Sequence, residues 1–353
     1  MDRTYSKYFA ALHRKELNII RDLVMTKGCL VNYQFGDSSF PIHIAAEKDY
    51  LDVLKFLIAA NTSVDLKNRH GQTALLLGIS HRRIVQALIV AGAQVNLSDP
   101  HGRTALHLAC AIGQIDTVTD LIEAGARVDA HDKWGRTPLH VTLLNITHNQ
   151  SIAHIYIQVI TVLLQKGCNV NQGDRQCSTP LFLAVAVGDS SLDIVKMLIS
   201  HGAYPDLRSR HKLTPLMLSI MKGYVKHCML LLSHNCNVNW RITATKNSCL
   251  RTAVKKGYVN IARLIIAAGC DLTREEWLYQ PWDYTIMSQS ETTLVWLREL
   301  QSTPQSLKHL SRSNVRKTHG IHLRKYMEQI HYPAILKKFI LLEDIIPEAI
   351  TRM

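Results

Sequence analysis

The chain has 353 residues, and its 47% hydrophobic and 20% charged residues are typical of a folded globular protein with a large core. This composition excludes collagen-like and low-complexity chains, and no apolar run is long enough for a membrane span or a signal peptide. The net charge of +13 is unevenly spread, because residues 207–270 hold 11 basic and no acidic side chains. We therefore expect an intracellular protein, cytoplasmic or nuclear, with one strongly basic region.

A short phrase recurs from the N-terminus to residue 272. It has the form Gly92-Ala-Gln-Val-Asn96 or Gly125-Ala-Arg-Val-Asp129, and its copies start at residues 28, 61, 92, 125, 167, 202, 235 and 269. A second phrase, of the type Thr137-Pro-Leu-His140, keeps the same phase. Two series in step indicate an internal repeat of one supersecondary unit.

Each unit predicts a pair of helices. The Thr of the second phrase is a helix N-cap, and Pro is accepted in the first turn that follows. Apolar pairs four residues apart, such as Val53-Leu54 with Leu57-Ile58, indicate the second helix, and the Gly or Asn after it supplies a left-handed C-cap. The pattern resembles the ankyrin repeat, with about eight units and a degenerate first one. The resemblance implies a helical solenoid whose concave face binds other proteins.

Eight cysteines and 18 histidines raise the question of a zinc site. Four cysteines take a repeat position that alanine fills elsewhere, which predicts a small buried side chain rather than a ligand. They are Cys29, Cys168, Cys236 and Cys270, against Ala93, Ala126 and Ala203. The resemblance implies that His43, His107 and His140 hydrogen-bond between neighbouring turns. Together with the absence of nucleophile, phosphate-loop or metal motifs, this predicts a protein with no cofactor, no metal and no catalytic residues.

Two features suggest a surface for a substrate or other partner. The fourth interval, from residue 125 to residue 167, is about nine residues longer than the others, which predicts a lengthened loop near Asn149, whether functional or merely tolerated. The basic block would attract an acidic or phosphorylated partner, or it is only a solvated face. Few aromatic residues interleave with the charges, which disfavours nucleic acid. The candidate surface comprises Arg208, Arg210, Lys212, Lys222, Lys226, Arg241, Lys246 and Asn149.

The repeat phase stops after Asp271. We assign residues 1–272 to the repeat domain, 273–302 to a linker or capping helix, 303–345 to a small domain of three helices and 346–353 to a tail. Leu307, Leu310, Ser311 and Val315 fall on one face of a helix whose other side is basic. Pro333 begins the third helix. So small a domain needs a partner, or the last repeat, to pack against.

Residues 304–316 and 330–341 resemble a SOCS box, so the full chain is similar to the ankyrin repeat and SOCS box family. In that family the box recruits elongin B, elongin C and cullin-5 with its RING subunit. The resemblance implies that Leu307 inserts into an elongin C pocket beside Leu310, Ser311 and Val315. It implies cullin contact through Ile330, Tyr332, Pro333 and Leu336.

Two residues depart from the family pattern. Ser311 stands where the family usually has Cys, and Ile330-His-Tyr-Pro333 keeps only the second of two prolines. The lost proline leaves this segment less preorganised for a cullin than the first helix is for elongin.

The sequence thus predicts a noncatalytic substrate-recognition adaptor of an elongin B/C and cullin-5 RING ubiquitin ligase. Two alternatives stay open. One is an ankyrin scaffold that binds an acidic partner through its basic repeats and uses the tail as a cap. The other is a family member that binds elongins without a cullin and sequesters its target.

Overall fold

The computed structural model describes residues 3–27, 31–35, 39–148, 153–242 and 247–275. By internal contacts the chain divides into two units, Met1–Arg175 and Gln176–Met353. None of the helices in the described ranges is both long and apolar enough to cross a membrane.

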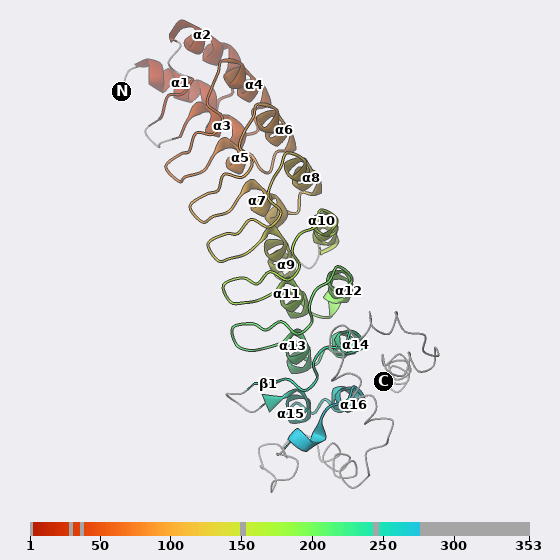
Figure 1. Ribbon diagram of the computed structural model, residues 1–353. Helices are drawn as coiled ribbons and strands as arrows, with labels where there is room; N and C mark the ends of the chain where they lie inside the picture. Colours follow the sequence, from red (N-terminus) through yellow and green to blue (C-terminus); the bar gives the residue numbers. More distant parts are fainter. Residues whose placement is uncertain (1–2, 28–30, 36–38, 149–152, 243–246, 276–353) are drawn as a thin grey trace. The chain divides into compact units, whose positions relative to one another are not determined.

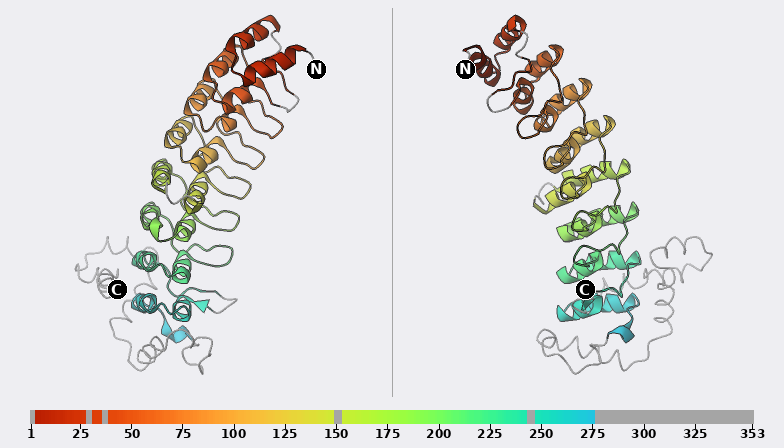
Figure 2. Two further views of the ribbon diagram at one scale, coloured as in Figure 1. Left: turned by 180° about the vertical axis from the view of Figure 1, so that it is seen from behind. Right: turned by 60° about the vertical axis from the view of Figure 1, so that its left-hand side comes forward.

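Unit 1 is a stack of helix pairs joined by long loops, which project to the left in Figure 1. The first helices of the pairs pack on one another in one row. The second helices form a parallel row on the side away from the loops (Figures 1 and 2). The helices are α1 (Arg3–His13), α2 (Leu17–Lys27), α3 (Pro41–Glu47), α4 (Leu51–Ala59), α5 (Ala74–Leu77), α6 (Arg82–Val90), α7 (Ala105–Ile112), α8 (Ile115–Glu123), α9 (Pro138–His148) and α10 (Ala153–Gln165).

Unit 2 repeats the arrangement, with α11, α13 and α15 in one row and α12, α14 and α16 in the other. Its helices are α11 (Pro180–Val187), α12 (Leu192–Ser200), α13 (Pro215–Lys222), α14 (Val225–Ser233), α15 (Cys249–Lys255) and α16 (Val259–Ala267), with short 3-10 turns η2 (Asp189–Ser191) and η3 (Leu272–Arg274). The fold is not purely helical, because β1 (Arg241–Ile242) and β2 (Asn247–Ser248) form a small antiparallel ladder with Arg241 opposite Ser248.

The predicted caps are confirmed. Thr179 Oγ1 accepts a hydrogen bond from the Phe182 N–H, and Thr214 Oγ1 accepts one from Met217 N–H. These bonds satisfy amide groups that a helix start leaves unpaired. After the second helices the chain turns through positive φ at Gly125 (+88°) and at Asn61 (+63°), which are residues that tolerate this backbone region.

The paired apolar residues form the core, as predicted. Val53, Leu54 and Leu57 of α4 are fully buried, and so are Leu121 of α8 and Leu198 of α12. Burying a side chain of this size contributes about 2 kcal/mol, so each helix is held by the apolar face it shares with its neighbours.

The long fourth interval proves to be mostly helix, so the prediction that the extra residues form a loop is wrong for most of them. α9 and α10 have 11 and 13 residues, whereas α7 and α8 of the preceding repeat have 8 and 9. The second helix of this repeat, α10, starts at Ala153. The inserted residues are apolar and β-branched at helical spacing, and Tyr156 among them is buried, which favours extra helical turns.

Candidate functional site

The histidines of the second phrase connect neighbouring repeats. His107 is fully buried, its Nδ1 accepts a hydrogen bond from the Thr104 N–H at 3.3 Å, and its Nε2 lies 3.0 Å from the Arg136 carbonyl oxygen. His43 makes the same kind of contact, with Nε2 3.0 Å from the Leu66 carbonyl oxygen. We term the long loops between successive helix pairs the finger loops. His43 and His107 hold the bases of two of them, at Leu66 and at Arg136, against the helix of the preceding repeat, as the family resemblance implied.

Aspartates build the turns at the tips of two finger loops in unit 1. Asp99 Oδ1 accepts hydrogen bonds from the N–H groups of His101 and Arg103, at 2.8 and 2.9 Å. In the next finger, Asp132 Oδ1 accepts one from the Trp134 N–H at 2.8 Å. Both aspartates are buried, so these fingers direct their acidic groups inward and leave the surface to other side chains.

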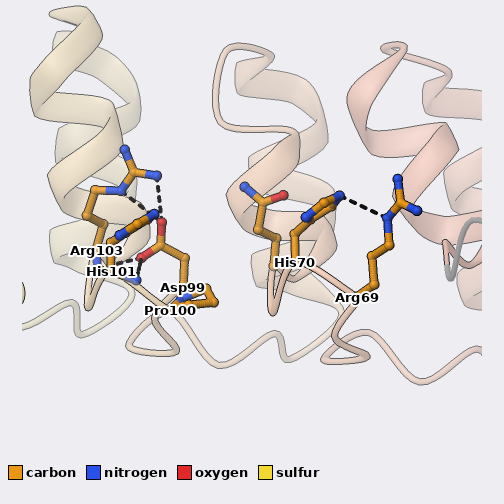
Figure 3. Close-up of a pocket in the computed structure, with 7 residues that line it drawn as sticks. Arg69, His70, Asp99, Pro100, His101 and Arg103 are labelled. Atoms are coloured by element: carbon orange, nitrogen blue, oxygen red, sulfur yellow. Dashed lines mark hydrogen bonds and ion pairs between the residues drawn. The ribbon is translucent and has the colours of Figure 1, made fainter.

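The Arg103 guanidinium folds back onto Asp99, as Figure 3 shows, with Nη2 at 2.7 Å and Nε at 2.8 Å from Oδ2. Burial alone would raise the pKa of Asp99, but the hydrogen bonds from Arg103 lower this pKa below its ordinary value. The carboxylate therefore stays ionised at neutral pH, and it neutralises part of the Arg103 charge within the finger.

Backbone hydrogen bonds join adjacent fingertips. The Lys133 N–H donates to the His101 carbonyl oxygen at 2.8 Å, and the Arg175 N–H donates to the Trp134 carbonyl oxygen at 2.9 Å. The side chains at consecutive tips are therefore held in a fixed order along the edge of unit 1.

An open groove lies between two of these fingers. Its volume is about 550 Å³, and it is lined by Arg69, His70, Gln72, Asp99, Pro100, His101 and Arg103 (Figure 3). Gly71 has φ +66° at its edge, and a Cβ there would approach Pro100 Cγ to 2.7 Å. The two fingers are thus in contact at this point, and their cationic side chains flank the opening.

The exposed side chains of these tips form what we term the fingertip row: Arg69, His70, His101, Lys133, Trp134 and Arg175. The sequence analysis missed it, because the residues come from separate repeats and make no charge run. The signal that could have found it is the pair of residues before the glycine of each finger turn, compared across repeats. These turns have Gly71, Gly102 and Gly135, with Cys177 at the equivalent position in the next finger.

The predicted basic surface lies in unit 2, and part of it is a single finger. Arg208, Arg210 and Lys212 are all exposed there. The Arg208 guanidinium carbon lies 3.6 Å from the centroid of the Trp240 ring, and Trp240 Nε1 donates a hydrogen bond to the Lys212 carbonyl oxygen at 2.9 Å. The indole thus fixes one cation of this finger in place.

Lys222 and Lys226 are exposed but lie elsewhere. α13 begins beside the finger at Pro215 and ends at Lys222, and Lys226 follows in the first turn of α14. A helix of eight residues is about 12 Å long, so the structure separates these two lysines from the finger cations. The cations between residues 208 and 226 therefore form two separate groups rather than one continuous patch.

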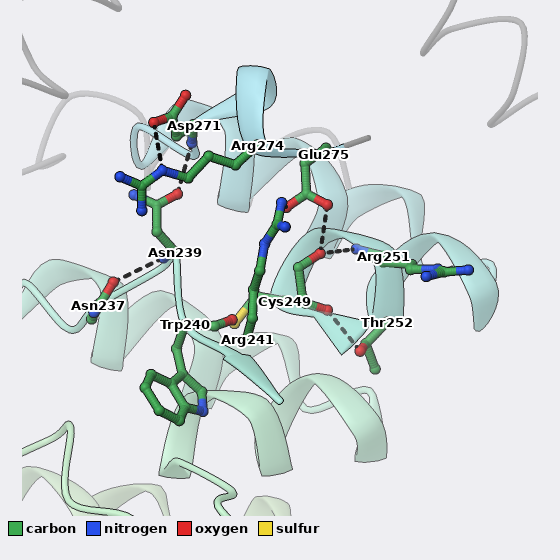
Figure 4. Close-up of polar contacts among 11 residues, drawn as sticks. Asn237, Asn239, Trp240, Arg241, Cys249, Arg251, Thr252, Asp271, Arg274 and Glu275 are labelled. Atoms are coloured by element: carbon green, nitrogen blue, oxygen red, sulfur yellow. Dashed lines mark hydrogen bonds and ion pairs between the residues drawn. The ribbon is translucent and has the colours of Figure 1, made fainter. Parts of the chain in front are cut away.

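Arg241 is not an uncompensated cation. Its Nη2 lies 3.5 Å from Glu275 Oε1, and Ser248 Oγ donates a hydrogen bond to Glu275 Oε2 at 2.8 Å, as Figure 4 shows. Glu275 is 3% exposed and follows the basic block in sequence, so charge counting within residues 207–270 could not reveal the pair. Lys246 and Asn149 lie outside the described residues.

A serine, a histidine and an aspartate approach one another in unit 2, which the sequence did not indicate. Ser191 Oγ lies 3.2 Å from His227 Nε2, and His227 Nδ1 lies 3.6 Å from Asp189 Oδ1. However, Ser191 Oγ also contacts the carbonyl oxygens of Ala184 and Gly188 at 2.6 and 2.7 Å, and Ser191 is fully buried. A hydroxyl with no exposed surface and its proton shared with backbone carbonyls is a structural bridge between α11, η2 and α14 rather than a nucleophile.

These buried imidazoles predict a dependence of stability on pH. Burial lowers the pKa of His107 and His227, and the interaction of His227 with Asp189 opposes this only in part. The unfolded chain takes up protons at these sites below about pH 6.5, whereas the folded chain takes them up only at lower pH. We expect the free energy of unfolding, measured in urea, to fall as the pH drops from about 7 to 5, before the carboxylates titrate.

The variant His227→Gln should weaken that pH dependence, because it removes one of the two groups. His154, an exposed histidine of α10, provides the matched control as His154→Gln. An unchanged slope in His227→Gln would contradict the assignment.

Three of the four cysteines at the repeated position are buried, as predicted, and the fourth, Cys29, lies outside the described residues. Cys168, Cys236 and Cys270 are at most 8% exposed, and Ala93, Ala126 and Ala203 at the same position are similarly covered. Burial raises the pKa of the Cys168 thiol to about 12, so it is a neutral apolar group near pH 7. Within the described ranges no three or more His, Cys, Asp and Glu side chains gather as a metal site would require.

The residues predicted to contact elongin (Leu307, Leu310, Ser311, Val315) and a cullin (Ile330, Tyr332, Pro333, Leu336) lie outside the described residues. Their roles stay predictions.

Two proteins of known sequence are similar to parts of this chain. A human protein named Ankyrin repeat and SOCS box protein 14 is 24% identical over 242 residues, which cover 52% of this chain and 40% of the relative. The Arabidopsis thaliana protein XBAT31, named as a proposed E3 ubiquitin-protein ligase, is 31% identical over 87 residues, which cover 25% of this chain and 19% of the relative. The chain thus spans less than half the length of these relatives.

Among solved structures, the ankyrin repeat domain of Bcl-3, described as a member of the IkappaB protein family, has a TM-score of 0.55. It is 24% identical, and the match covers 64% of this chain and 99% of that domain, so it supports the fold alone. The sequence profile described as Ankyrin repeats (3 copies) matches residues 8–99, 78–174 and 181–276. With the helix pairs, the finger loops and the bridging histidines, this match shows that the chain belongs to the ankyrin repeat family.

Proposed function

We propose that this protein is a noncatalytic substrate-recognition adaptor of an elongin B/C and cullin-5 RING ubiquitin ligase. The observation that carries the proposal is the C-terminal pattern of Leu307, Leu310, Ser311 and Val315, which follows the ankyrin repeats after residues 273–302. The name of the human relative, which pairs ankyrin repeats with a SOCS box, supports it. The ankyrin stack is a protein-interaction module, which suits a subunit that supplies proximity and orientation rather than chemistry.

In this proposal the two ends of the chain have different tasks. The stack binds the target, for which the exposed finger cations Arg208, Arg210 and Lys212 are the candidate contacts. The C-terminal segment recruits elongin B and elongin C and, through residues 330–341, cullin-5. The single retained proline at Pro333 makes the cullin contact the weaker of the two.

Affinity capture from cells tests the proposal. The full-length chain is compared with a chain truncated after residue 302, and bound proteins are measured by quantitative mass spectrometry. We expect elongin B, elongin C and cullin-5 on the full chain only, and substrates on both. Elongins without any cullin would instead favour sequestration of the target.

The second candidate function is an ankyrin scaffold without ligase activity. The finger in which Trp240 orders Arg208 favours it, because this surface needs no C-terminal segment to bind an acidic partner. If neither chain captures elongins and both capture the same acidic proteins, the scaffold is correct and the adaptor is not.

A further inference from the structure

The fingertip row of unit 1 separates positive from negative charge. Lys133 and Arg175 are exposed, and neither has an ion-pair partner among the described residues. Arg69 uses Nε to contact His70 Nε2 at 3.0 Å, which leaves its two terminal nitrogens as donors. The acidic neighbours Asp99 and Asp132 are buried inside their turns. Asp174, next to Arg175, is half-buried. The outer edge of these fingers therefore presents exposed cations, with one partly exposed carboxylate beside Arg175.

The row is also rigid, which lowers the entropic cost of binding. Hydrogen bonds between backbone groups join the tips at His101 and Lys133 and again at Trp134 and Arg175. Because these tips cannot shift independently, Lys133 and Arg175 are held in order along one edge. The finger that carries Arg69 lies against the next finger where Gly71 approaches Pro100.

Trp134 adds an apolar contact in the middle of this series. Its side chain is 44% exposed, which is unusual for so large an apolar group in a folded chain. His101 lies nearly parallel to the indole, with ring centroids 5.7 Å apart, and the Arg136 guanidinium lies 5.3 Å from the indole centroid. An exposed, positioned tryptophan among cations is typical of a residue that anchors a protein partner.

We infer that the fingertip row is a docking surface for an extended acidic segment of a partner protein, with carboxylates on Arg69, Lys133 and Arg175 and an apolar side chain beside Trp134. Guanidinium groups match planar carboxylates through paired N–H donors. This surface is distinct from the finger of unit 2, and the inference holds whether or not the C-terminal segment recruits elongins.

An acidic peptide fits the row better than a single-stranded nucleic acid does. Nucleic-acid channels stack successive bases on several aromatic side chains. The row has one exposed indole, and His101 and Arg136 already contact its ring. The carboxylates of an acidic peptide can bind the cations of the row without any aromatic stacking. The charge complementarity of the row therefore favours a peptide over a nucleic acid.

A binding titration tests the inference with the full-length chain and a fluorescein-labelled peptide, Glu-Asp-Glu-Leu-Glu-Asp-Glu, followed by fluorescence anisotropy. We expect the double variant Lys133→Glu with Arg175→Glu to bind at least about tenfold more weakly than the unmodified chain. The neutral pair Lys133→Gln with Arg175→Gln should fall between them. Circular dichroism should be unchanged, because both side chains are exposed.

The matched control reverses two exposed cations on the helical side of the same unit, Arg83→Glu in α6 with Lys166→Glu after α10. It changes the net charge equally and should alter affinity by less than about twofold. An equal loss in this control would overturn the inference, because the peptide would then respond only to net charge.

Two further binding measurements distinguish this surface from the unit 2 finger and a peptide from RNA. If Arg210→Glu with Lys212→Glu abolishes peptide binding while the fingertip variant does not, the acidic surface belongs to unit 2 and the inference is wrong. A labelled oligouridylate that binds more tightly than the peptide, and is lost in the fingertip variant and in Trp134→Ala, would overturn the peptide assignment in favour of RNA.

Discussion

Replacing Leu307 by aspartate is expected to abolish binding of the purified chain to a preformed elongin B/C complex. On the proposed helix, Leu307 is the side chain that enters an apolar pocket of elongin C. A carboxylate there has no partner and must lose its hydration, so the loss should reach about a thousandfold in affinity, roughly 4 kcal/mol. Isothermal titration calorimetry or surface plasmon resonance measures it directly.

The matched control is His309→Asp, two residues further along the same segment on its basic side. It introduces the same carboxylate where we expect solvent, so affinity should stay within about threefold. Elongin binding by Leu307→Asp at the strength of the unmodified chain would show that the helix assignment is wrong. A loss in both variants would mean that the segment binds elongin with a different face.

The variant His107→Ala is expected to lower the free energy of unfolding by about 3 kcal/mol, which is the largest effect we predict for the ankyrin stack. The imidazole is fully buried and contacts the Thr104 N–H and the Arg136 carbonyl oxygen. Alanine leaves a cavity and removes the acceptor of the Thr104 N–H, while the Arg136 carbonyl oxygen keeps only the hydrogen bond from the Asp132 N–H. Because Arg136 belongs to the next finger, the coupling between the two repeats is weakened as well.

Urea unfolding followed by circular dichroism measures the global change, and hydrogen exchange locates it. Faster exchange of amides in α7 and in the finger at Arg136 is expected. His131→Ala is the matched control, since this exposed histidine of the same region should alter stability by less than about 0.5 kcal/mol. Equal effects of the two variants would contradict the bridging role of His107.

The repeat architecture was predictable from sequence because it depends on local chemistry. The Thr179 cap, the positive φ at Gly125 and the burial of Leu54 and Leu57 each follow from a residue type at a fixed repeat position. The repeated phrases also placed Cys168 correctly in the core. Each of these conclusions needed only the identities of residues a few positions apart.

The ion pairs could not be predicted in the same way, because an electrostatic interaction depends on the distance between two charges in space. Arg241 looked unpaired within residues 207–270, yet Glu275 lies beside it because η3 folds over β2 and α15. Lys222 and Arg210 belong to one basic block in the sequence. In the structure Arg210 lies in the finger before α13, and Lys222 lies at the far end of that helix. A charge count along the chain could not distinguish these cases.

The sequence by itself determined the ankyrin repeats, the caps and the buried positions of this protein, because a repeat buries its apolar face against neighbours of the same pattern. Only the tertiary structure decided which charges meet, that the insertion lengthens α9 and α10, and that Arg69, Lys133, Trp134 and Arg175 share one edge. The charge pairs and the shared edge depend on how segments from different repeats lie next to one another, and residues about 30 or more positions apart have no local pattern that reveals it.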